Sequence, residues 1–162
     1  MKECTMKSAA AIVLAACLAL TGCSYRNYSK STTPANIQGE AKWESSHIWE
    51  STLIYRVGNF TIYGGDYQIG TIFTVDPGQQ MILAWYKANR GIDGGAPIWQ
   101  TDLVEFNANL KPNGKYQVLG DYGEKSVRFK LVDLDTQEVI VESSETPIIR
   151  RPTGVAPSPP TR

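Results

Sequence analysis

The segment Leu103–Gly120, LVEFNANLKPNGKYQVLG, has the clearest fold signal in this sequence. From Val104 to Leu110, apolar and polar side chains alternate strictly. Successive side chains of a β-strand point to opposite faces, so this alternation predicts a strand with one buried face. The next four residues, Lys111–Gly114, contain a proline that presets φ and an Asn-Gly pair that tolerates positive φ. They predict a tight turn that leads into a second strand from Lys115.

The same combination of strand and turn recurs along the chain. Turns at Asp76-Pro77-Gly78 and Asp135-Thr136-Gln137 separate further apolar-rich runs. One run, QQMILAWY at residues 79–86, is apolar on both faces and predicts a central strand. The best helical candidate, residues 39–51, is short and fits an irregular lead-in or an edge strand equally well. Seven or eight short strands between residues 40 and 149 predict an all-β domain, either an antiparallel sandwich or a small barrel.

The N-terminal segment, residues 1–22, has the pattern of a secretory signal peptide. Lys2 and Lys7 precede the apolar run Ala9–Leu20. That run is about 12 residues long, whereas a membrane-spanning helix needs about 20. Met6 is an alternative start to Met1, because a segment that begins at Met6 lacks the acidic residue Glu3 and fits the signal-peptide pattern more cleanly.

The apolar run ends in Leu20-Thr21-Gly22-Cys23, which resembles the lipobox of bacterial lipoproteins. The resemblance implies cleavage between Gly22 and Cys23, attachment of lipid to the Cys23 sulfur, and acylation of the new N-terminus. The alternative is a buried helix that ends in Gly-Cys. The residue after Cys23 is Ser24 and not Asp, which in enteric-type bacteria implies transfer to the outer membrane.

The two ends of the mature chain differ in composition from its middle. Ser24–Gly39 is polar, so we expect residues 23–39 to form a flexible tether between the lipid on Cys23 and the domain. Residues 150–162 include four prolines, and we expect a disordered tail that does not enter the sheet. The predicted domain therefore covers residues 40–149.

The order of strands and turns also resembles a family of small bacterial envelope lipoproteins with a transthyretin-like or PEGA-type sandwich. The resemblance covers residues 53–142 and includes the Pro-Gly turn at Pro77-Gly78 and the Gly-Lys-Tyr strand start at Gly114–Tyr116. It implies an Ig- or transthyretin-like antiparallel β-sandwich. These modules share no catalytic residues, so the resemblance assigns none here.

Composition argues against several kinds of partner. The chain has 16 basic and 16 acidic residues, whereas a nucleic-acid partner requires a basic surface. All three cysteines lie at or before Cys23, so no disulfide can form in the rest of the chain. A single histidine, His47, argues against a zinc site, and the acids Asp133 and Asp135 are a thin ligand set for Ca²⁺. We expect no metal and no cofactor.

Catalytic patterns are weak in this sequence. His47 is the only histidine available as a base, and its neighbours Ser45 and Ser46 cannot reach it as an oriented nucleophile by adjacency alone. A hydrolase that uses two converging carboxylates needs a pair held in a cleft, whereas the acids here are scattered over polar strand faces and turns. We therefore expect that the protein is not an enzyme.

The loop Lys87–Pro97, KANRGIDGGAP, is the best candidate contact site. It contains three glycines and the oppositely charged Arg90 and Asp93, and Trp99 follows it. Loops on a rigid β-scaffold commonly hold binding residues, and a flat aromatic ring can stack on a sugar or dock a partner. The alternative is that the loop is a plain connector.

Together these patterns predict a lipid-anchored structural or accessory binding component on the periplasmic face of the outer membrane. Its expected partners are membrane lipid, through acylated Cys23, and an envelope protein. The alternative is a periplasmic lipoprotein that binds carbohydrate or peptidoglycan, or that inhibits a hydrolase.

Overall fold

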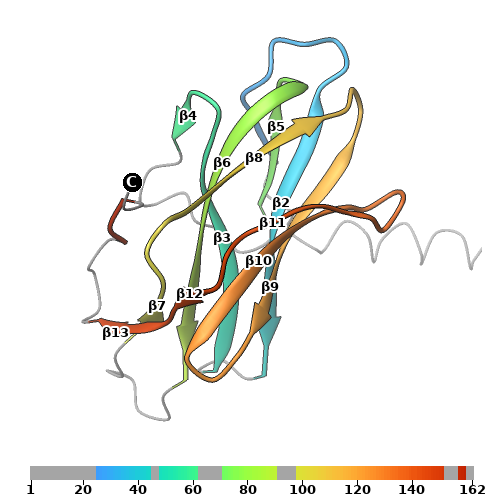
Figure 1. Cartoon of the computed structure of the whole chain (residues 1–162). Coiled ribbons are helices and arrows are strands. Elements are labelled where there is room, and N and C mark those ends of the chain that lie inside the picture. Colours follow the sequence, from blue (N-terminus) through green and yellow to red (C-terminus); the bar gives the residue numbers. More distant parts are fainter. Residues whose placement is uncertain (1–24, 45–47, 62–70, 91–97, 152–156, 160–162) are drawn as a thin grey trace, which may run out of the picture.

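The fold is all-β, as predicted (Figure 1). The computed structural model describes residues 25–44, 48–61, 71–90, 98–151 and 157–159. Among these residues, no helix is long and apolar enough to span a membrane. The strands are β1 (Tyr25–Asn27), β2 (Ala35–Trp43), β3 (Trp49–Val57), β4 (Phe60–Thr61), β5 (Ile72–Val75), β6 (Gly78–Asn89), β7 (Ile98–Gln100), β8 (Val104–Leu110), β9 (Lys115–Tyr122), β10 (Ser126–Asp133), β11 (Val139–Glu142), β12 (Thr146–Pro147) and β13 (Ile149–Arg151).

These strands form one continuous sheet that curls on itself (Figure 1). The main apolar core lies inside the curl. Its main path runs β11-β10-β9-β2-β3-β6-β7-β13, while β8 pairs with β6 and β1 pairs with β5. A sandwich of two separate sheets is not confirmed, because β2 pairs into both halves of the curl and leaves no break between them.

Strand β2 changes partners at Gly39. Residues 36–39 of β2 pair in parallel with β9, and residues 40–43 pair antiparallel with β3. At this crossing the backbone of β3 comes so close that a Cβ on Gly39 would overlap the carbonyl oxygen of Thr52. Glycine is therefore required here for close backbone approach.

The alternating segments have the predicted orientation. In β8, buried and exposed residues alternate along the whole strand. The turn at Lys111–Gly114 has Asn113 at a positive φ of 58°, and the amide of Gly114 donates to the carbonyl of Lys111 at 3.1 Å. Tyr116 completes this hairpin, because its hydroxyl accepts the amide N–H of Lys111 at 2.8 Å.

Two apolar clusters lie on opposite faces of β6. The main core lies inside the curl and takes side chains from both halves of the sheet, including Ile37, Ile82 and Phe129. The second cluster lies on the other face of β3 and β6 and consists of Leu53, Leu83, Trp85 and Leu103, with Tyr55 packed against it. This two-sided burial confirms that β6 is a central strand.

The predicted tether boundary at Gly39 is wrong. Residues Tyr25–Asn27 form β1, which pairs in parallel with β5, and Ala35 and Ile37 of β2 are fully buried. The connection between β1 and β2 is bound to the body, because Ser29 Oγ and the amides of residues 30 and 31 donate to one carboxylate oxygen of Asp76 at 2.6 to 3.1 Å. The polar residues that suggested a tether occupy turns and the outer positions of β2.

The predicted tail boundary at residue 150 is also wrong. Arg150 and Arg151 belong to β13, which pairs with β7. Arg151 pairs with Asp102, and the amide of Ser158 donates to the same carboxylate at 3.2 Å. The amide of Leu103 in turn donates to the carbonyl of Ser158 at 3.0 Å, so part of the proline-rich segment is attached to the sheet.

We expect Gly39→Ala to destabilise the fold by about 2–3 kcal/mol, because the Thr52 carbonyl is backbone and cannot rotate away from the added methyl group. Urea unfolding of the Cys23→Ser chain with and without the substitution measures the difference. Gly123→Ala is the matched control, since its Cβ would meet the nearest backbone oxygen at 3.4 Å. Equal losses for the two variants would show that β2 does not need glycine at the crossing.

Candidate functional site

The best candidate site is a group of polar side chains that we call the tyrosine–glutamate cluster. It lies where β2, β3, β6 and β9 come together at the end of the sheet from which the chain leaves β6. Glu40, Thr52 and Tyr86 form one cross-strand row in β2, β3 and β6, so their side chains share a face. The full cluster consists of Glu40, Lys42, Glu50, Thr52, Tyr86, Arg90 and Tyr122.

Tyr86 links the core to one ion pair of the cluster. The residue is fully buried within the main core, and its hydroxyl donates to Glu50 Oε1 at 3.0 Å. Arg90 donates to the Tyr86 hydroxyl at 2.8 Å and pairs with Glu50 Oε1 through Nη2 at 2.9 Å and through Nε at 3.1 Å. Each of the three groups therefore contacts the other two.

Tyr122 occupies the corresponding place beside the other glutamate. Its hydroxyl donates to Glu40 Oε2 at 3.0 Å and lies 3.0 Å from the hydroxyl of Thr52. Lys42 pairs with Glu40 at 3.2 Å and lies 4.6 Å above the Tyr122 ring. The Tyr86 and Tyr122 ring centroids are 5.0 Å apart, so the two halves of the cluster are in contact.

Burial sets the protonation state of these tyrosines. It raises the pKa of Tyr86 well above the usual range, and the negative charge of Glu50 raises it further. Burial also raises the pKa of Tyr122, an effect that Glu40 strengthens and the hydrogen bond with Thr52 partly offsets. Both tyrosines therefore stay protonated well into the alkaline range, and their hydroxyl groups act as hydrogen-bond donors to the two glutamates.

Of the predicted site residues, the structure describes Arg90 and Trp99, and it places them in different surroundings. Arg90 is in the cluster, with its side chain about one-third exposed (32%). Trp99 lies in β7 opposite Ala88, partly buried and packed against the main core, so it is not a freely exposed stacking platform. Asp93, Gly22 and Cys23 lie outside the described residues, as does His47.

Sequence reasoning missed Glu40, Glu50, Tyr86 and Tyr122 as site residues. A signal was present in β3, since Glu50 and Thr52 are in phase with the core residue Ile54. Polar side chains in phase with a buried face indicate a polar end to the core. No comparable signal joins β2 to β9, because their pairing is parallel and distant in sequence.

The acidic turn that suggested Ca²⁺ has its own internal partners. The carboxylate of Asp133 accepts the amides of Asp135 and Thr136 at 3.0 and 3.3 Å, and Lys111 lies 3.5 Å away. Burial by itself would raise the pKa of Asp133, but these N–H groups and Lys111 hold it below the usual value. Within the described ranges, no three His, Cys, Asp or Glu side chains come together as metal ligands.

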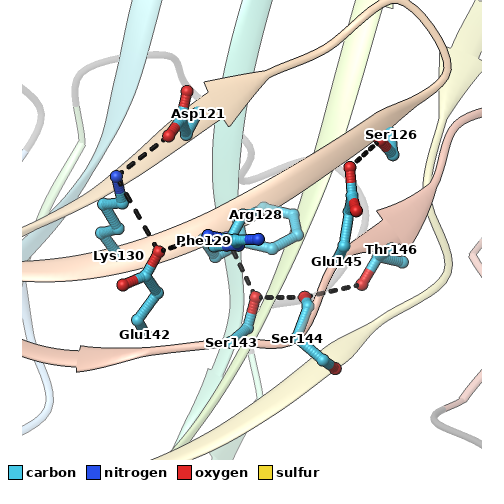
Figure 2. Close-up of polar contacts among 10 residues, drawn as sticks. All are labelled: Asp121, Ser126, Arg128, Phe129, Lys130, Glu142, Ser143, Ser144, Glu145 and Thr146. Atoms are coloured by element: carbon cyan, nitrogen blue, oxygen red, sulfur yellow. Dashed lines mark hydrogen bonds and ion pairs between the residues drawn. The ribbon is translucent and has the colours of Figure 1, made fainter.

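The outer face of β9, β10 and β11 contains a second set of polar contacts (Figure 2). Lys130 bridges Asp121 at 2.9 Å and Glu142 at 3.8 Å, and Glu142 also pairs with Arg128 at 3.3 Å. Acidic and basic groups alternate across neighbouring strands, so they neutralise one another locally. This surface links the edge strand β11 to the sheet and concentrates no single charge for a ligand.

Comparisons of the chain with protein-family models, with curated proteins and with solved structures gave no match. No residue role is therefore transferred from another protein. The interpretation of the cluster rests on its own geometry.

We expect the raised tyrosine pKa values to make the fold sensitive to alkali. In the unfolded chain a tyrosine loses its proton near pH 10, whereas Tyr86 and Tyr122 keep theirs in the folded state. Their contribution to stability is complete below pH 10 and is lost as the pH rises above it, by about 1.4 kcal/mol per pH unit for each tyrosine. Urea unfolding at several pH values from 9 upward gives the free energy of unfolding as a function of pH. The decrease in this free energy per pH unit should be smaller in Tyr86→Phe and in Tyr122→Phe than in the parental chain.

The control is Phe60→Leu, which changes a partly exposed ring outside the cluster and should keep the parental slope. Parental slopes in both phenylalanine variants would contradict the assignment of these tyrosines as protonated donors.

Proposed function

We propose that the protein is a lipid-anchored component of the bacterial cell envelope that acts by binding. The observation that carries the proposal is the lipobox Leu20–Cys23 at the end of a signal-like segment. Acylation of Cys23 attaches several hydrocarbon chains, and two or more such signals are enough for stable membrane attachment. Ser24 after the cysteine supports the outer membrane, with the domain on its periplasmic face.

We propose that the domain works as a scaffold for contacts with another envelope protein, without enzymatic activity. The tyrosine–glutamate cluster supports this, because its tyrosines hold their protons and its charged groups are paired. An Ig- or transthyretin-like sandwich remains our proposal for the fold type. Its support is that both halves of the curled sheet contribute side chains to one core.

A second candidate function is the binding of carbohydrate or peptidoglycan, or of a hydrolase that is thereby inhibited. The observation that favours it is the position of Arg90, partly exposed at the end of the sheet and held by Tyr86 and Glu50. A guanidinium held in place in this way can donate to sugar hydroxyls or to a carboxylate of a partner.

We expect Cys23→Ser to move the protein from the membrane fraction to the soluble fraction, because the substitution removes the thiol that lipid modifies. Cell fractionation, combined with mass measurement of the mature protein, tests this. Cys17→Ser is the matched control, since Cys17 lies in the segment that we expect to be removed, and this variant should stay in the membrane fraction. Membrane attachment of Cys23→Ser at the parental level would refute lipid anchoring.

The second candidate function predicts that the soluble Cys23→Ser chain sediments with insoluble peptidoglycan or binds immobilised lysozyme. Arg90→Ala should then lower the bound amount severalfold, because the substitution removes a partly exposed donor that Tyr86 and Glu50 hold in place. Lys125→Ala, at a position outside the cluster, controls for loss of one positive charge. No binding by the parental chain would dispose of this candidate without affecting the anchoring proposal.

A further inference from the structure

The distance between the lipid and the domain is limited by the chain itself. Strand β1 begins at Tyr25, only two residues after Cys23. Two residues reach at most about 7 Å, so the Cα atom of Cys23 lies within about that distance of the Cα atom of Tyr25. Under the proposed function, the edge of the sheet formed by β1 is therefore held close to the membrane.

Next to this edge the sheet has a surface groove. Its volume is about 240 Å³, and its lining includes Gln38 of β2, Ile72 of β5, Lys115 of β9 and Leu134. Ile72 pairs with Tyr25 on one side and with Gln38 on the other, so the groove starts one strand away from β1. The neighbouring residue Phe73 points into the main core, and Ile72 consequently faces the outside of the curl.

Two polar residues of the groove lining, Asn36 and Lys115, direct their polar groups to other partners. The side-chain oxygen of Asn36 accepts a hydrogen bond from Thr74 Oγ1 at 3.1 Å. Lys115 Nζ pairs with Asp135 at 3.2 Å, at the solvent-exposed end of its side chain. The aliphatic stem of Lys115 and the side chains of Ile72 and Leu134 give the lining an apolar part, and Gln38 lies beside it. Apolar side chains bordered by polar groups suit an interface between hydrocarbon and water.

We propose that the outer face of β5, β2 and β9, centred on this groove, lies against the membrane surface to which Cys23 is attached. Ile72 and Leu134 contact lipid hydrocarbon, and the ammonium group of Lys115 lies at the level of the lipid headgroups. The inference rests on the proposed lipid anchor. It goes further because it says which face of the domain the bilayer covers.

Spin labels on single introduced cysteines test this orientation. In the lipidated mature chain the thiol of Cys23 is blocked, so Ile72→Cys, Leu134→Cys and Ile149→Cys each provide one reactive thiol. Ile149 is the control, because it is a partly exposed apolar residue of β13 at the far end of the sheet path. Each labelled protein is reconstituted in phospholipid vesicles, and the accessibility of the label to oxygen and to a water-soluble nickel chelate is measured.

We expect the ratio of oxygen accessibility to nickel accessibility to rise severalfold at positions 72 and 134 in vesicles, relative to the same label on an unlipidated chain in which Cys4, Cys17 and Cys23 are all replaced by serine. The ratio at position 149 should stay unchanged.

Flotation of the vesicles separates the two proposals. Protein that floats with unchanged ratios at 72 and 134, or with a rise at 149 alone, overturns the orientation and leaves the anchor intact. Lipobox-containing protein that neither receives lipid nor floats overturns both. Circular dichroism of each labelled variant confirms that the sheet is retained.

Discussion

The close approach of Gly39 to the carbonyl of Thr52 is the constraint on which the rest of this fold depends. At this point β2 leaves β9 and continues as the partner of β3, which turns two groups of strands into one curled sheet. The curl brings Phe129 of β10 and Ile82 of β6 into one core, although they lie on different halves of the sheet. Any residue with a Cβ would force the two backbones apart and open that core.

The tyrosine–glutamate cluster is a direct consequence of the same crossing. Glu40 is the first residue after Gly39, and its register opposite Thr52 places it in the same cross-strand row as Tyr86. Tyr122 arrives from β9, the strand that β2 has just left. Because the hydroxyl groups and carboxylates satisfy one another there, the core can end in polar groups without leaving them buried and unpaired.

Local patterns in the sequence were sufficient for the elements whose partners are near in sequence. Strict alternation identified β8 and its turn to β9, and the apolar run at residues 79–86 identified β6 as central. The pairing of β2 with β9 and of β1 with β5 is parallel and long-range, and no local pattern specifies it. For that reason local patterns predict a tether over residues 23–39, and of the cluster that those long-range pairings assemble they single out only Arg90.

The early start of the sheet changes how an anchor at Cys23 would act. A tether of about 17 residues would let the domain sample many orientations, whereas a link of one residue between Cys23 and β1 restrains it. With the outer face of β5, β2 and β9 against the lipid, the tyrosine–glutamate cluster lies on the inner side of the sheet, at the other half of β2. Under the proposed anchoring, a binding partner would have to approach from the end of the curl where Arg90 is partly exposed, and the membrane would limit the geometry of binding.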